Sequence, residues 1–66
     1  MEITVNGKPL AVSEPLTVAE LVALLDLPDR GIAVALNGAV VPRTRWQESH
    51  LPASADVEVL TAVQGG

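Results

Sequence analysis

The chain has 66 residues, a formal charge of −4 and no cysteine. A domain of this size buries only about 60% of the surface that its unfolded chain exposes, so it has little room for both a core and an enclosed catalytic cleft. The acidic charge argues against nucleic-acid binding, and the lack of cysteine excludes disulfides, thiolate catalysis and cysteine-based metal sites. These properties favour a small carrier or binding module over an autonomous enzyme.

The N-terminal pattern predicts a β-hairpin. Met1, Ile3 and Val5 alternate with polar residues, which is typical of a strand with one buried face. Asn6-Gly7 follows and is a strong signal for a two-residue turn, because a type I′ turn needs positive φ at both central residues. Leu10 and Val12 continue as a second strand. Pro9 cannot donate a ladder hydrogen bond, so this strand should lie at the sheet edge.

A helix should follow, opened by a capping box in which the Thr17 hydroxyl and the Glu20 carboxylate cap each other's backbone amides. Leu16 is placed to form a hydrophobic staple with Leu21. One apolar stripe is formed by residues at helical spacing: Val18, Leu21, Val22 and Leu25. Leu24 lies off this stripe and should be half exposed. We expect Asp26 and Asp29 at the exit of the helix, with Pro28 and Gly31 ending it.

The second half of the chain predicts another hairpin and a last strand. Residues 32–36 are almost all apolar, as in an interior strand, and Asn37-Gly38 repeats the hairpin signal before Val40 and Val41. Pro42 again marks an edge, and residues 43–56 read as irregular. In the last strand, 57–62, one face carries Val57, Val59 and Thr61, and the other carries Glu58, Leu60 and Ala62.

The order of hairpin, helix, hairpin and strand predicts an α+β fold, with a mixed sheet of four to five strands and one main helix across one face. A right-handed crossover would put the last strand beside the first, in the middle of the sheet. This is the β-grasp arrangement. We expect a β-grasp domain over residues 1–62 and a flexible tail over residues 63–66.

The tail ends in Gly65 and Gly66, a pair that arises by chance in roughly one chain in 200. If the pair has no function, it is a frayed chain end or a residue of the expression strategy. Against this, the pair directly follows a patterned strand. A free carboxylate is ionised at neutral pH and needs activation before a nucleophile can attack it. Glycine fits a narrow site because it has no Cβ, and residues 63–66 can extend about 13 Å. We therefore expect Gly66 to carry the chemistry, with Gly65, Gln64 and Val63 recognised by a partner.

The remaining functional candidates are surface residues. Trp46 is the only aromatic residue; it either anchors the irregular segment or contacts a partner. Arg43 and Arg45 flank it, on a solvated loop or in an interface. A docking surface near the tail would include Leu60, Ala62, Arg43, Arg45 and Trp46. His50 has no visible acid or nucleophile beside it and is best read as a structural or surface residue. We find no catalytic residue and no metal site.

The chain resembles the sulfur-carrier proteins of thiamine thiazole synthesis, a ubiquitin-like family. The resemblance covers nearly all residues and includes Leu16–Leu21, Ala33–Gly38, Val41-Pro42-Arg43 with Trp46, and Thr61–Gly66. The Val-Pro-Arg and Trp segment joined to Val-Gln-Gly-Gly is more specific than the glycine pair alone. Where the family often has an acidic-Gly-Asp turn, this chain has Ser54-Ala55-Asp56, so we expect a changed loop shape there.

The resemblance implies a carrier that is not itself an enzyme. An activating enzyme of the ubiquitin-activating type would use ATP to adenylate Gly66. Sulfur from a cysteine-derived persulfide, made by a desulfurase or another donor, would then give a thiocarboxylate, and thiazole synthase would receive the sulfur. No permanently bound cofactor is implied. The alternatives are the small subunit of molybdopterin synthase, a protein modifier joined to lysine, and a plain binding module with an inert tail.

The same sequence carries no signal for a membrane or for export. It has no run of about 18 apolar residues, and Met1–Thr4 shows no basic region before an apolar core. We therefore expect the cytoplasm as its location.

Overall fold

The structure is a computed structural model that describes residues 1–12, 15–28 and 30–61. It contains β1 (Glu2–Val5), β2 (Lys8–Ala11), α1 (Val18–Leu24), β3 (Ile32–Leu36), β4 (Ala39–Val41), the 3-10 helix η1 (Arg43–Arg45) and β5 (Asp56–Thr61). The expected boundary between a domain at 1–62 and a tail at 63–66 lies outside the described residues. Within the described ranges, no helix is long and apolar enough to cross a membrane.

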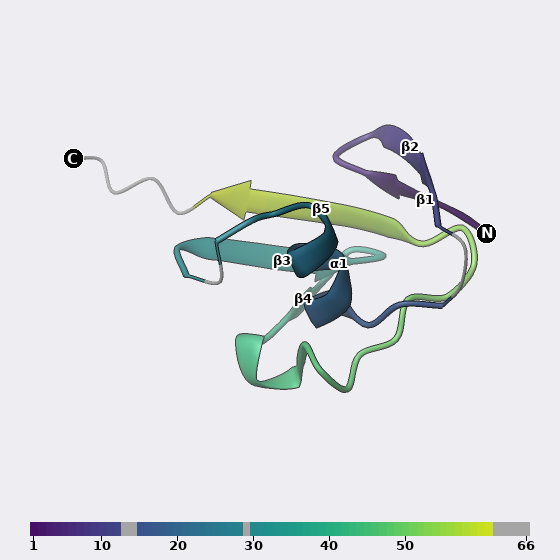
Figure 1. Cartoon of the computed structure of the whole chain (residues 1–66). Coiled ribbons are helices and arrows are strands. Elements are labelled where there is room, and N and C mark those ends of the chain that lie inside the picture. The colour runs from purple at the N-terminus through teal and green to yellow at the C-terminus, as the bar shows by residue number, and fades with distance from the viewer. Residues whose placement is uncertain (13–14, 29, 62–66) are drawn as a thin grey trace.

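The strands form one mixed sheet in the order β2-β1-β5-β3-β4, with α1 across one face (Figure 1). β5 runs parallel to β1 and antiparallel to β3, so the last strand lies in the middle of the sheet. β2, which contains Pro9, and β4, which Pro42 follows, lie at the edges as predicted. The five-stranded sheet with one helix confirms the β-grasp prediction.

Both hairpins turn as the Asn-Gly pairs predict. Asn6 and Gly7 have φ of 51° and 81°, and Asn37 and Gly38 have φ of 50° and 88°. These are left-handed values, which asparagine and glycine adopt at low cost. The residue type at each turn therefore fixes the two hairpins locally.

The helix begins as predicted and ends earlier. Thr17 is the N-cap, and its hydroxyl and the Glu20 carboxylate form the capping box. We expected Pro28 and Gly31 to end the helix, but its last residue is Leu24. The reason is Asp26, which takes a left-handed φ of 56°. Its N–H donates to Ala23 and that of Leu27 donates to Val22, which is a Schellman ending without glycine.

The core lies between α1 and the sheet. Its buried members are Ile3, Val12, Val18, Leu21, Val22, Val34, Trp46, Leu51, Ala55 and Val57. The predicted helical stripe is buried at Val18, Leu21 and Val22, and Leu24 is 60% exposed. Met1 differs from the expected alternation, since it is 39% exposed. It precedes β1 and contributes its backbone instead, exchanging hydrogen bonds with Val12.

The segment before β5 turns without glycine. Ser54 has φ of 62°, and its N–H donates to the Glu2 carbonyl at 2.9 Å. The next residue, Ala55, is buried. Serine therefore occupies a left-handed position that favours glycine. The expected change of loop shape relative to the resembling proteins stays a prediction.

Candidate functional site

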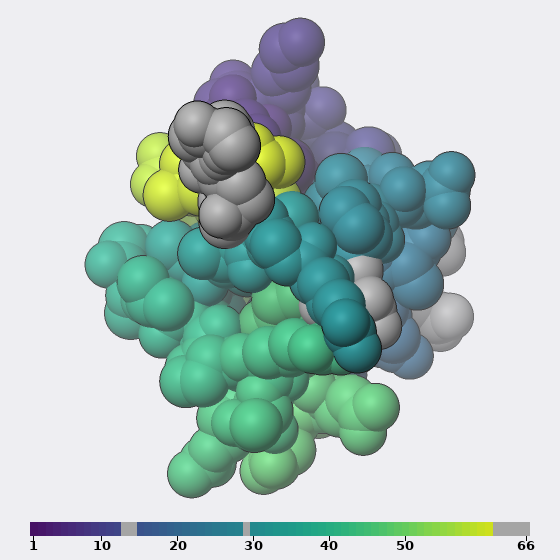
Figure 2. Space-filling model, turned by 90° about the vertical axis from the view of Figure 1, so that its left-hand side faces the viewer, coloured from purple at the N-terminus to yellow at the C-terminus, as the bar shows by residue number. Residues whose placement is uncertain are grey.

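The candidate site is the carboxyl end of β5, from which the chain continues to the glycine pair. Figure 2 looks at this end of the molecule: the last residues of β5 (yellow) are at the surface, with the β1–β2 hairpin (purple) on one side and the teal β3 region on the other. The predicted residues Ala62, Val63, Gln64, Gly65 and Gly66 lie outside the described residues. The structure therefore defines how the strand that leads to them is held.

The two neighbours of β5 hold it unequally. β3 pairs with β5 over five residue pairs, from Leu36↔Val57 to Ile32↔Thr61. β1 pairs with it over only two, Thr4↔Asp56 and Val5↔Val57. The outer half of β5 is therefore paired to a strand on one side only. Figure 1 shows β5 running well beyond the β1–β2 hairpin.

Two asparagine side chains add to these ladders. The Asn6 Oδ1 accepts the Val59 N–H at 2.7 Å, and its Nδ2 donates to the Val59 carbonyl at 3.3 Å. The Asn37 Oδ1 accepts the Asp56 N–H at 2.8 Å. Sequence reasoning missed both contacts, because it assigned these asparagines only to their turns. The repeated Asn-Gly signal marked the residues but not their partners.

Leu60 points to the face of the sheet that α1 does not cover. It is 63% exposed and pairs across the ladder with Ala33. On the same face, Val40 is 71% exposed and pairs with Ala35. Together these four residues form an apolar surface across β5, β3 and β4, which we call the open-face patch. The alternation of β5 predicted the direction of Leu60, but Val40 was not among the predicted docking residues.

Trp46 lies on the other side of the sheet, against α1. It is only 5% exposed, its Nε1 donates to the Val41 carbonyl at 3.0 Å, and its own carbonyl accepts the Ala19 N–H. The structure thus confirms Trp46 as the anchor of the irregular segment. A partner contact for it stays a prediction. The expected docking residues therefore fall on two faces, with Leu60 on one and the segment Arg43–Trp46 on the other.

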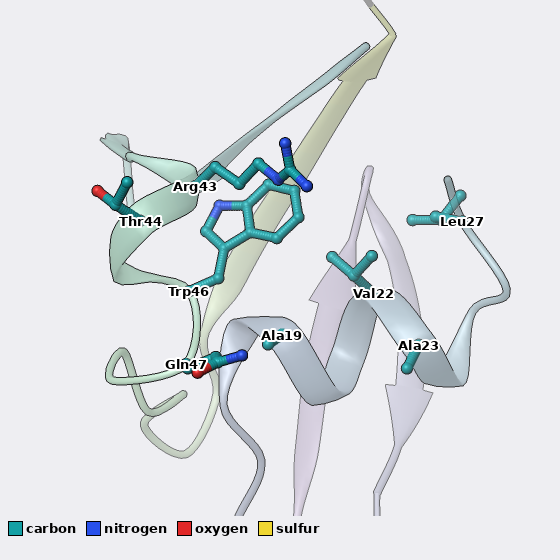
Figure 3. A pocket seen from close by; sticks show the side chains of 8 residues that line it. All are labelled: Ala19, Val22, Ala23, Leu27, Arg43, Thr44, Trp46 and Gln47. Carbon is teal, nitrogen blue, oxygen red and sulfur yellow. The ribbon is translucent and has the colours of Figure 1, made fainter. Parts of the chain in front are cut away.

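A pocket of about 540 Å³ lies between α1 and η1. It is lined by Ala19, Val22, Ala23, Leu27, Arg43, Thr44, Trp46 and Gln47. Figure 3 shows the Arg43 side chain beside the indole ring, and Val22 facing that ring from α1. Arg45 does not line the pocket. It forms an exposed ion pair with Glu48 at 3.8 Å, which contributes little to stability because water screens it. Sequence reasoning did not foresee this pocket, which forms where two distant elements meet.

Neither the pocket nor the rest of the described residues supplies a metal site. Among residues 1–12, 15–28 and 30–61, no group of three histidine, aspartate or glutamate side chains could hold a metal ion. His50 is exposed and bridges to Thr17 through its backbone.

Comparisons with known proteins agree with this picture. The sequence model of the ThiS family matches residues 1–66. The chain is 29% identical over 66 residues to the sulfur carrier protein ThiS of Escherichia coli K12, covering 100% of both chains. It is also 32% identical to the uncharacterised protein ycf40 of Porphyra purpurea, covering 100% of this chain and 93% of that one. A crystal structure of the thiamine biosynthesis protein ThiS from Geobacter metallireducens superimposes with a TM-score of 0.87 and 36% identity, covering 100% of both chains. The chain therefore belongs to the ThiS family of ubiquitin-like sulfur carriers.

Proposed function

We propose that the chain carries sulfur on Gly66 and delivers it for the thiazole ring of thiamine. The observation that carries this proposal is the place of the glycine pair. The two glycines stand four and five positions after Thr61, the last residue of the central strand β5, in a chain whose residues 1–66 match the ThiS family.

The proposed chemistry has three steps. A carboxylate oxygen of Gly66 attacks the α-phosphorus of ATP in an activating enzyme of the ubiquitin-activating type, forming an acyl adenylate and releasing pyrophosphate. A persulfide, formed with sulfur from a cysteine desulfurase, then attacks the acyl carbon and AMP leaves. A thiol reduces the resulting acyl disulfide, which frees the thiocarboxylate for thiazole synthase. The carrier supplies the carboxylate and the recognition surfaces, and its partners supply the catalytic groups and the ATP.

The open-face patch is the proposed docking surface for these partners. Leu60, on the strand that leads to the tail, and Val40, two strands away on β4, are large apolar side chains left exposed on one face of the sheet. Exposed apolar surface of this kind is typical of transient interfaces. Arg43 and Arg45, on the opposite side, stay candidates for a second contact.

Intact-mass measurement of the carrier, incubated with its activating enzyme, ATP and a sulfur donor, tests the proposal. We expect a mass increase equal to one oxygen replaced by one sulfur, localised to the C-terminal peptide. Removal of Gly66 withdraws the carboxylate by about 3.4 Å, so ATP–pyrophosphate exchange should fall by at least about 100-fold with the melting temperature unchanged. Full exchange activity without Gly66 would refute the role of that residue. A ladder of larger conjugates in cell lysate would instead indicate a protein modifier.

The same exchange assay tests the docking surface. Leu60→Gln should raise the KM for the carrier about tenfold, the effect of losing an interface hot spot. Leu24→Gln is the matched control, because Leu24 is 60% exposed on α1 and Leu60 is 63% exposed on β5. Equal KM values for the two variants would exclude the open-face patch as the docking surface.

A further inference from the structure

The side chain of Asn6 acts as one more strand residue beside β5. β1 pairs with β5 only as far as Val5↔Val57. The Asn6 backbone N–H then donates to the Val57 carbonyl at 2.8 Å, and the Asn6 amide takes both backbone groups of Val59 at 2.7 and 3.3 Å. A side-chain amide has the donor and acceptor of a peptide group, so it extends the ladder after the backbone of β1 has turned away.

Among the described residues, the contact with Val59 is the last one on this side of β5. In a strand, backbone groups of alternate residues point to the same neighbour, so those of Thr61 point the same way as those of Val57 and Val59. Within the described part of the chain, no strand residue pairs with Thr61 from that side. On the other side, β3 follows β5 to Ile32↔Thr61. Beyond Val59, therefore, β5 is held from one side only.

We infer that Asn6 is a positioning residue for the adenylation of Gly66. The inference rests on the proposed function. By holding both polar groups of Val59, the Asn6 amide sets the direction in which β5 leaves the sheet, and seven residues then lead from Val59 to Gly66. A change of direction at Val59 shifts Leu60 and Thr61, the point from which the chain continues towards Gly66. The Asn6 amide would thereby determine how often a docked carrier presents its carboxylate correctly.

The alternative is that Asn6 merely stabilises the fold, and the chain contains a matched control for it. Asn37 stands in a second Asn-Gly turn of the same kind, with φ of 50° against 51° for Asn6. Its side-chain amide also binds β5. It binds at Asp56, however, which is the first residue of β5 and the far end from the tail. The two asparagines thus share their turn chemistry and differ in where they hold β5.

The experiment compares Asn6→Gly with Asn37→Gly. Glycine keeps both turns, because it adopts positive φ freely, and it removes only the amide. In Asn6→Gly, hydrogen exchange at the Val59 amide should be about tenfold faster, since its acceptor is lost near a strand end. In ATP–pyrophosphate exchange, the KM for this variant should rise about fivefold with kcat unchanged. The reason is that a smaller fraction of the carrier presents its C-terminal carboxylate in the orientation that adenylation needs. Asn37→Gly should leave the KM within about twofold of wild type. Its melting temperature should be similar to that of Asn6→Gly.

A conservative variant adds a rescue test. Asn6→Asp keeps the acceptor for the Val59 N–H and loses the donor, so its KM should lie between those of wild type and Asn6→Gly. Equal KM values for Asn6→Gly and Asn37→Gly would show a purely structural role and overturn the inference. So would an unchanged KM in Asn6→Gly, or unchanged exchange at Val59. Failure of the wild-type carrier to support ATP–pyrophosphate exchange would overturn the proposed function and this inference with it. The Val59 exchange data distinguish the two cases, because they require no enzyme.

Discussion

The β1–β2 and β3–β4 hairpins turn on the same dipeptide and have nearly the same backbone angles, with φ of 51° and 81° at Asn6-Gly7 and of 50° and 88° at Asn37-Gly38. Each hairpin puts one strand beside β5 and the other at the sheet edge. They differ in how far they follow β5, since β3 shares five residue pairs with it and β1 only two.

The side-chain amides of Asn6 and Asn37 bind β5 differently because of this difference in pairing. Asn6 makes two hydrogen bonds to Val59, 53 residues later, where β1 has no backbone to offer. Asn37 makes one side-chain bond to Asp56, 19 residues later, beside a bond from its own backbone N–H. The same local sequence therefore gives the same turn. The role of the amide depends on the register between the hairpin and a strand that comes much later in the chain.

The largest expected effect is on the free energy of unfolding, and it compares a buried residue of the first hairpin with an exposed residue of the second. Ile3 in β1 is 1% exposed and belongs to the core, whereas Val40 in β4 is 71% exposed. Ile3→Ala should lower the free energy of unfolding by about 2–5 kcal/mol, through lost burial and the cavity left behind. Val40→Ala should change it by less than about 0.5 kcal/mol. Chemical denaturation followed by Trp46 fluorescence measures both.

Ile3→Val provides a milder variant in case Ile3→Ala does not fold. It should cost about 0.5–1.5 kcal/mol. If Ile3→Val and Val40→Ala cost the same, the first hairpin would not contribute to the core in the way its burial indicates.

The second effect tests whether the two turns are equivalent. Gly7 and Gly38 both have left-handed φ, and a Cβ at either would meet nothing within 4 Å. Alanine would therefore be disfavoured only by its backbone conformation, and Gly7→Ala and Gly38→Ala should each cost about 1–2 kcal/mol. Thermal unfolding of the two variants should give closely similar melting temperatures. A large difference between them would mean that the turns are not equivalent.

The smallest effect extends the comparison to the turn before β5. Ser54 has φ of 62° in a position that has neither asparagine nor glycine. Ser54→Gly should raise the free energy of unfolding by about 0.5–1 kcal/mol, because glycine adopts this conformation without the steric cost. Ala53→Gly, one residue earlier and without positive φ, is the control and should lower stability slightly. Destabilisation by Ser54→Gly would show that the serine side chain, and not its backbone strain, matters there.

Sequence reasoning worked best where a feature depends on neighbours in the chain. The Asn-Gly turns, the capping box of Thr17 and Glu20 and the alternation along β5 all follow from residues a few positions apart. It was wrong on the end of α1, because a left-handed aspartate is less common than glycine or proline as a stop signal. It predicted an exposed Leu60 but did not place Val40 on the same face of the sheet, because that placement depends on two separate strand pairings.

The sequence by itself determined the two hairpins, the start of the helix and the choice of Gly65 and Gly66 as candidate functional residues, because turn and cap chemistry and residue identity are local properties. The tertiary structure alone decided which residues of β5 bind the Asn6 and Asn37 amides. It also buried Trp46 beside Arg43 on one side of the sheet (Figure 3). On the other side it left Leu60 exposed. These outcomes depend on strand register and on packing between residues far apart in the chain, which no local pattern encodes.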